Sequence, residues 1–182
     1  MKPEQKARYQ IDHLLQAAGW TVQDLKELNL EASPGVAVRE FPLETGPADY
    51  LLFIDKKAVG AIEAKPYGTT LSGIAEQSQL YVTHIPFDLP SAQIPLPFVY
   101  ETTGIETFFR DLRDPYPRSR RVFAFHRPET MLEWLSQNET LRTRLMKIPE
   151  ISPLIESGLR DCQVEAIHNL EKSFCDMRPR TL

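Results

Sequence analysis

The sequence has few cysteines, no long apolar run and no excess of positive charge. Its two cysteines, Cys162 and Cys175, are too far apart for a metal knuckle, so we expect reduced thiols in a cytoplasmic protein rather than a disulfide framework. No apolar stretch is long enough to predict a membrane span, and the first residues lack the apolar core of a signal peptide. The net charge of −4 argues against a protein that coats nucleic acid over its whole surface.

A Gly-x-x-x-x-Gly-Lys-Ser/Thr loop is also missing from the sequence, which excludes a P-loop triphosphate site within these residues. The four histidines are scattered without ligand spacing. The length of 182 residues suits one domain with a tail. What remains to carry chemistry is a small set of charged residues inside apolar segments.

Two neighbouring segments place charged side chains inside predicted strands. Residues 46–54 predict a strand entered through Asp49, and residues 58–65 predict a strand that ends in Glu63 and Lys65. Side chains alternate along a strand, so Glu63 and Lys65 point to the same face, and in a hairpin Asp49 lies beside them. Two carboxylates with open water positions suit Mg²⁺, and the lysine can serve a metal-bound water. A solvated sheet edge with a surface ion pair is the alternative.

A predicted helix follows the two strands. Residues 70–83 have Thr70 as a plausible N-cap and an apolar face of helical spacing. Gln77 and Tyr81 are four residues apart and therefore project from the same side of this helix. They would reach the carboxylates and hold a water or a phosphate oxygen. The alternative is an ordinary amphipathic helix with a buried tyrosine.

These motifs together resemble a known nuclease core. Asp49, Glu63-Ala-Lys65 and Gln77-x-x-x-Tyr81 are similar to the PD-(D/E)xK core in the subgroup that adds a Q-x-x-x-Y helix. The wider sequence resembles the amino-terminal endonuclease domain of the R (restriction) subunit of type I restriction–modification enzymes. The stretches that carry this resemblance are residues 35–42, 48–52, 59–65, 97–104 and 121–128.

The resemblance implies an α/β fold, in which helices flank a mixed central sheet, and assigns roles to the motif residues. Asp49 and Glu63 would bind Mg²⁺, for which Mn²⁺ could substitute, and Lys65 would serve the attacking water. Gln77 and Tyr81 would support the active site or contact DNA. Asp49 follows an alanine rather than the proline of the general motif.

A further acid is common in this fold, and the sequence leaves its identity open. Glu27 and Glu40 are the candidates.

The activity implied by the resemblance is Mg²⁺-dependent hydrolysis of double-stranded DNA after ATP-driven translocation. Modification (methyltransferase) and specificity subunits would be the protein partners, in the cytoplasm and without a membrane. Two alternatives stay open: a catalytically inactive nuclease-fold module that binds DNA or a partner subunit, and a related nuclease of a repair or mobile-element system.

An arginine-rich segment at residues 107–127 is the candidate for a local DNA-binding patch. Six arginines and four aromatic residues are interleaved there with two aspartates. Arginines at this density can grip phosphates, and we predict DNA contacts for Arg118, Arg120 and Arg121. A solvated loop that joins two strands is the alternative.

The carboxy-terminal end resembles a second family. Residues 159–170 are similar to the segment that opens superfamily 2 helicase cores, in which Gln163 would read the adenine of ATP. An amphipathic surface helix is the alternative. Because no P-loop is present, ATP would act only through a motor absent from this chain, and we expect a fragment of a longer motor-nuclease. The predicted domains are residues 1–146 (endonuclease), 147–158 (linker) and 159–182 (start of a truncated motor domain).

The remaining periodicity predicts the elements around the motifs. We expect an antiparallel meander of three strands that begins with residues 35–41, and loops or linkers without regular structure at residues 84–97 and 149–157. Helices are expected at residues 3–18, 128–136 and 139–146, and later strands at residues 98–102 and 121–125.

Overall fold

The computed structural model describes residues 2–71, 81–176 and 178. The chain forms two compact units. The first unit comprises Met1–Leu112 and Tyr116–Ser136, and the second comprises Arg113–Pro115 and Gln137–Leu182. Each unit is described by itself.

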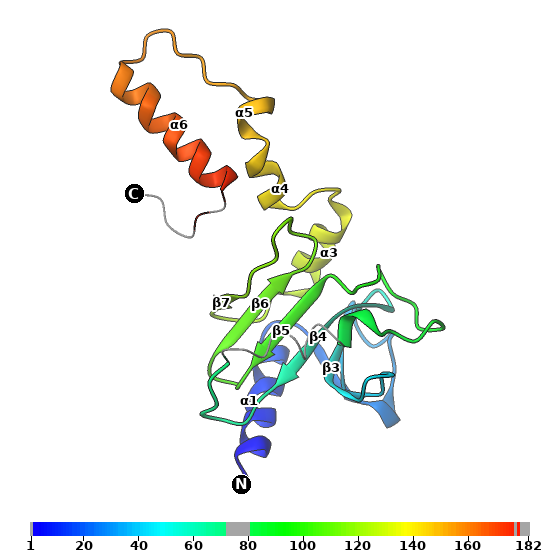
Figure 1. Ribbon diagram of the computed structural model, residues 1–182. Coiled ribbons are helices and arrows are strands. Elements are labelled where there is room, and N and C mark those ends of the chain that lie inside the picture. The colour runs from blue at the N-terminus through cyan, green and yellow to red at the C-terminus, as the bar shows by residue number, and fades with distance from the viewer. Residues whose placement is uncertain (1, 72–80, 177, 179–182) are drawn as a thin grey trace. The chain divides into compact units, whose positions relative to one another are not determined.

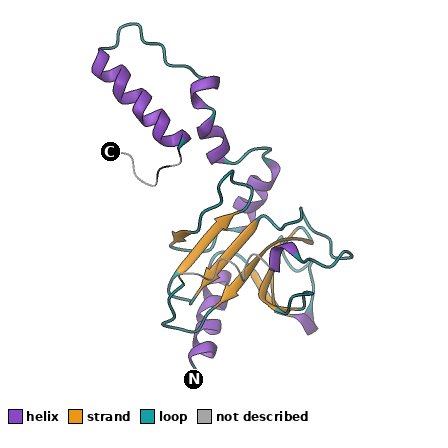
Figure 2. Ribbon diagram, viewed as in Figure 1, coloured by secondary structure: helices purple, strands orange, loops and turns teal. Residues whose placement is uncertain are grey.

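The first unit is built on a seven-stranded sheet whose strands follow one another in chain order (Figures 1 and 2). The pairs β1·β2 and β4·β5 are parallel and the other four are antiparallel. Helices α1 (Pro3–Ala17) and α3 (Pro128–Ser136) flank this mixed sheet, so the predicted α/β fold is confirmed. The strands are β1 (Thr21–Asp24), β2 (Gly35–Phe41), β3 (Ala48–Ile54), β4 (Lys57–Ala64), β5 (Phe98–Thr102), β6 (Thr107–Asp111) and β7 (Arg120–Val122), and a short 3-10 helix, η1 (Leu25–Glu27), follows β1.

The predicted antiparallel meander is confirmed as β2, β3 and β4. Strands β1 and β6 were not predicted from the sequence, and β7 is shorter than the expected strand at residues 121–125. Strand β1 is short and has only one strongly apolar residue, Val22, and none of its residues is fully buried. Its sequence therefore gives no apolar strand pattern. Strand β6 ends in two charged residues, Arg110 and Asp111, which are both buried.

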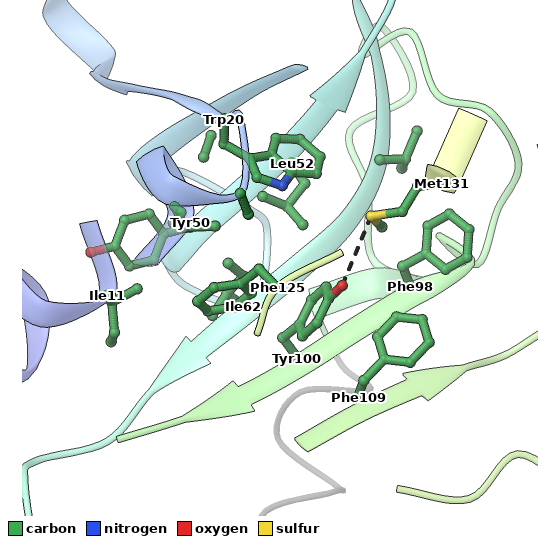
Figure 3. Packing of buried hydrophobic residues seen from close by; sticks show 14 of the residues in the cluster. Ile11, Trp20, Tyr50, Leu52, Ile62, Phe98, Tyr100, Phe109, Phe125 and Met131 are labelled. Carbon is green, nitrogen blue, oxygen red and sulfur yellow. Dashed lines mark hydrogen bonds between the residues drawn. The ribbon is translucent and has the colours of Figure 1, made fainter. Parts of the chain in front are cut away.

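One face of the sheet, called here the α1 face, packs against α1 and α3. Helix α1 buries Ala7, Ile11 and Leu15 on this face, because residues spaced by three and four share one side of a helix. Met131 of α3 and the aromatic rings of β5 and β6 complete the cluster, whose members converge in Figure 3. This apolar cluster is the larger part of the core.

The polar groups within the α1 face bind one another. The Tyr100 hydroxyl lies 2.6 Å from Nδ1 of His126, and the Trp20 indole N–H donates to the His126 carbonyl at 2.9 Å. Burial raises the pKa of the Tyr100 phenol, so the hydroxyl keeps its proton, and it also lies 3.9 Å from the Met131 sulfur.

The opposite face, called here the Tyr81 face, has its own apolar cluster. Tyr81, Val82 and Ile85 pack there with residues of the central strands, among them Leu51 and Ala61. Residues 81–83 are helical, whereas residues 72–80, which hold most of the predicted helix and Gln77, lie outside the described residues. The segment after the second strand of the hairpin therefore contributes to the Tyr81 face.

The second unit contains three helices among its described residues: α4 (Leu141–Met146), α5 (Ile148–Ile151) and α6 (Asp161–Cys175). Thr140 caps α4, because its hydroxyl accepts from the Thr143 N–H at 3.2 Å. The thiol of Cys175 donates to the Met146 carbonyl at 3.3 Å, which links α6 to α4. Residues 149–157, expected without regular structure, instead begin inside α5. The compact units divide after Ser136, and the predicted functional boundaries at residues 146 and 158 stay a prediction.

Within the described part of the chain, no helix is both long and apolar enough to cross a membrane.

Candidate active site

Three acidic residues form a row across three adjacent strands. The last recorded β3·β4 pair is Tyr50 with Ile62, so one residue further along this antiparallel ladder Asp49 faces Glu63. In the parallel β4·β5 pair, Glu63 is the register partner of Glu101. Neighbouring strands are about 4.8 Å apart, so the three acids lie side by side.

The alternation of side chains places this row on the Tyr81 face. Leu51, Ala61 and Val99 belong to the apolar cluster of that face, and each is two residues from one of the acids on the same strand. Residues two apart on a strand share a face. The row therefore borders the apolar cluster that contains Tyr81.

Asp49 is held by the backbone of the neighbouring strand. Its Oδ2 accepts the N–H of Ala64 at 2.7 Å. Burial raises the pKa of Asp49, the bond from Ala64 opposes this effect, and the nearby charge of Glu63 raises the pKa further. The positive charges of Arg8 and Lys65 act in the opposite direction. The two carboxylates are thus close enough to repel each other.

Glu63 has one satisfied oxygen and one open oxygen. Its side chain is 4% exposed, and Oε1 lies 2.5 Å from Nζ of Lys65. Its Oε2 is buried and has no hydrogen-bond partner. An unsatisfied buried carboxylate oxygen is costly, and a cation beside Asp49 would compensate it.

The donor set fits a hard divalent cation. In the described portion of the chain, no group of three or more His, Cys, Asp or Glu side chains is arranged to hold a metal. Two carboxylates, Asp49 and Glu63, are nevertheless the type of ligand set that Mg²⁺ uses, because Mg²⁺ keeps several waters and takes oxygens from a substrate phosphate.

The structure brings together most of the motif predicted from the strands. Asp49, Glu63 and Lys65 lie together, as the strand spacing predicts, and their catalytic roles stay a prediction. Tyr81 is 8% exposed and packs in the apolar cluster of the same face. Gln77 lies outside the described residues.

The predicted DNA-binding arginines lie on or next to β7. The guanidinium of Arg120 is 5.0 Å from the centre of the Phe109 ring, and Arg121 forms an ion pair with Glu106 at 3.3 Å. Arg118 is exposed. Arg120 is thus held over an aromatic ring and Arg121 by a surface carboxylate, and their contact with DNA stays a prediction.

The two candidates for a further acid are not in the acid row. Glu27 ends η1 and is exposed, and Glu40 pairs with Arg8 at 2.8 Å. In the second unit, Oε1 of Gln163 accepts the N–H of Arg160 at 2.9 Å and so caps α6. Its contact with ATP stays a prediction.

Glu101 and Arg110 are the two buried charges of this face that sequence reasoning did not select. Glu101 is 4% exposed and pairs with Arg110 at 3.5 Å. The signal was present for Glu101, since it is a charged residue in the middle of a predicted apolar strand, as Glu63 is. What the sequence does not show is that β5 lies next to β4.

Comparison with known proteins identifies the family of this chain. The family model described as "Type I restriction enzyme EcoKI endonuclease subunit second domain" matches residues 26–135. The type I restriction enzyme EcoKI endonuclease subunit of Escherichia coli (strain K12) is 28% identical, over 94% of this chain and 19% of its own length.

A solved structure shows the same fold. It is described as a fragment of an HsdR subunit of a type I restriction enzyme from Vibrio vulnificus YJ016, and it matches with a TM-score of 0.53 and 15% identity over 93% of this chain and 28% of its own. The chain thus spans about a fifth of the curated relative and about a quarter of the structural one. Because the family model covers more than half of the residues, the chain belongs to the family of the second domain of the type I restriction enzyme EcoKI endonuclease subunit.

Proposed function

We propose that this chain is the Mg²⁺-dependent endonuclease domain of a type I restriction enzyme R subunit and hydrolyses phosphodiester bonds of double-stranded DNA. The observation that carries the proposal is the buried, unpartnered Oε2 of Glu63 beside Asp49, with Lys65 fixed on the other oxygen. A purely structural ion pair would not leave a carboxylate oxygen open in the interior.

Each residue has a separate task in this chemistry. Asp49 and Glu63 would hold the metal ion, which when bound would polarise the scissile phosphate and lower the pKa of a water. The Ala64 N–H fixes the orientation of Asp49, and Lys65 fixes that of Glu63. The Lys65 ammonium also orients the attacking water and stabilises the negative charge that develops in the transition state.

The remaining parts of the activity belong to the longer protein. Cleavage follows ATP-driven translocation by a motor outside these residues, and modification and specificity subunits supply recognition of the DNA sequence. Tyr81, which packs in the apolar cluster of this face, supports the site, and Gln77 shares this task. Arg118, Arg120 and Arg121 contact the phosphates of the DNA beyond the site, because guanidinium groups bind phosphate in this way. Support for these assignments comes from the family and from the residue types.

The experiment replaces Glu63 by glutamine in the full-length R subunit assembled with its partner subunits. Glutamine keeps the shape but loses the charge that holds a cation, so we expect plasmid cleavage to fall at least about a hundredfold. ATP hydrolysis should continue at the wild-type rate, because the motor is separate. The matched control is Glu31→Gln, which removes a carboxylate from an exposed ion pair with Lys56 and should leave cleavage unchanged. Wild-type cleavage by Glu63→Gln would refute the proposal.

A further inference from the structure

One member of the acid row, Glu101, forms a buried ion pair with Arg110 that has no task in the proposed chemistry. Glu101 on β5 and Arg110 on β6 have side chains that are 5% and 10% exposed, and the guanidinium lies 3.5 Å from the carboxylate. Arg110 is the register partner of Val99, so it is diagonal to Glu101 on the same face. Burying two charges costs several kcal/mol per ion, and a hydrophobic pair of similar size is often as stable. A role other than stability is therefore expected.

Glu101 lies in the row but is not directed to its centre. It is the register partner of Glu63, which itself faces Asp49. Three neighbouring carboxylates could in principle close around one cation. Among the described residues, however, no such group of three is formed, and the Glu101 carboxylate is turned to Arg110. The ion pair thus keeps both members out of the Asp49–Glu63 pair.

We propose that Glu101 is a positioning residue that holds the Arg110 guanidinium away from Glu63, so that Oε2 of Glu63 stays open for the metal ion. The inference rests on the proposed function. The guanidinium is always charged and binds carboxylates through a planar fork of N–H groups. Glu63 offers an open, buried carboxylate oxygen one strand beyond Glu101. Without the Glu101 charge, Arg110 swings to that oxygen and competes with the metal ion.

The test measures Mn²⁺ binding by calorimetry in the full-length subunit. Glu101→Gln keeps the side-chain shape but removes the charge that pairs with Arg110, and Mn²⁺ binding should weaken about tenfold, the lower end of the effect of removing a supporting residue from a metal site. The double variant Glu101→Gln/Arg110→Met removes the competitor as well and should bind Mn²⁺ within about twofold of wild type. Cleavage by Glu101→Gln should recover at saturating Mn²⁺, because the residue acts on metal affinity and not on the chemical step.

The matched control is Glu106→Gln, which breaks the exposed Glu106–Arg121 pair and should not change Mn²⁺ affinity. Equal affinity of Glu101→Gln and wild type would overturn the inference, and so would a double variant as weak as the single one. Absence of Mn²⁺ binding by the wild type would instead overturn the proposed function. If Glu101→Gln does not fold, Arg110→Met alone decides: the inference requires affinity at least equal to wild type, and tenfold weaker binding overturns it.

Discussion

The two faces of the central sheet differ in how the oxygens of their acids are satisfied. On the α1 face, Asp12 is fully satisfied: both its oxygens accept from the Arg39 guanidinium, at 3.1 and 3.0 Å, and one also accepts from the Tyr50 hydroxyl at 2.8 Å. On the Tyr81 face, Glu63 keeps a buried oxygen without a partner. An acid that serves the fold has its hydrogen bonds made within the protein, whereas an acid that serves a metal ion leaves a position open.

The difference extends to the surroundings of these acids. The α1 face is covered by α1 and α3 and is built around stacked or tilted aromatic rings, such as Tyr100 and Phe109 with centroids 4.8 Å apart (Figure 3). The acid row crosses the other face at the start of β3 and the end of β4, where charge replaces apolar packing. Stability should therefore depend mainly on the α1 face and catalysis mainly on the acid row.

The largest expected effect on stability is that of Leu15→Ala on α1, which tests whether stability depends mainly on the α1 face. Leu15 is completely buried in the aromatic-rich cluster, and truncation leaves a cavity, so the free energy of unfolding should fall by about 2–5 kcal/mol. Chemical denaturation of Leu15→Ala and Glu63→Gln compares their free energies of unfolding directly. A larger loss of stability for Glu63→Gln than for Leu15→Ala would show that the acid row, not the α1 face, holds the fold together.

The sequence was sufficient to predict the hairpin and its charged end. The apolar runs of β3 and β4 flank a two-residue turn, Asp55 and Lys56, whose φ angles of 45° and 67° suit a tight hairpin. The short connection makes the two strands antiparallel neighbours and brings the start of β3 beside the end of β4, although a shift of one residue between Leu52 and Phe53 sets the final register. Asp49, Glu63 and Lys65 could be placed together for this reason.

The rest of the site depends on contacts between distant segments. Strand β5 reaches β4 only after a connection of more than thirty residues, so no local pattern brings Glu101 beside Glu63. One indirect signal is Gly60 in the middle of β4: a Cβ there would lie 2.3 Å from the Phe98 carbonyl oxygen, which shows that β4 and β5 approach closely. Strand β6 escaped prediction because the burial of Arg110 depends on its pairing with Glu101.

A smaller effect is expected from pH on the α1 face. Burial lowers the pKa of His126 from its usual 6.5 to about 4, and the positive charge of Arg120 adds to this effect. The unfolded chain therefore binds a proton between pH 6.5 and 4 that the folded chain does not, so stability falls as the pH decreases through this window. The slope from one group is at most about 1.4 kcal/mol per pH unit, and partial exposure of the ring reduces it.

The measurement compares denaturation of wild type and His126→Gln at several pH values. Between pH 6.5 and 4, the stability of the variant should fall less steeply with decreasing pH than that of wild type. Below pH 4, where the histidine is protonated in both states, the two proteins should have the same pH dependence. If stability depends on pH in the same way in both proteins, His126 does not cause the decrease.

The smallest expected effect is that of Asp49→Asn on the free energy of unfolding. It distinguishes the two faces because this variant should gain stability, whereas Leu15→Ala should lose it. Asparagine keeps an oxygen that can accept the Ala64 N–H, but the repulsion between neighbouring carboxylates disappears. In the absence of divalent metal, the variant should be more stable than wild type by roughly 0.2–1 kcal/mol, the range for one cross-strand charge pair. Mg²⁺ should then raise the melting temperature of the wild type and not that of Asp49→Asn, because only the wild type binds the ion in its native state. No acid whose task is to hold the fold would give this pattern, and a loss of stability in metal-free Asp49→Asn would place Asp49 with Asp12 among the structural acids.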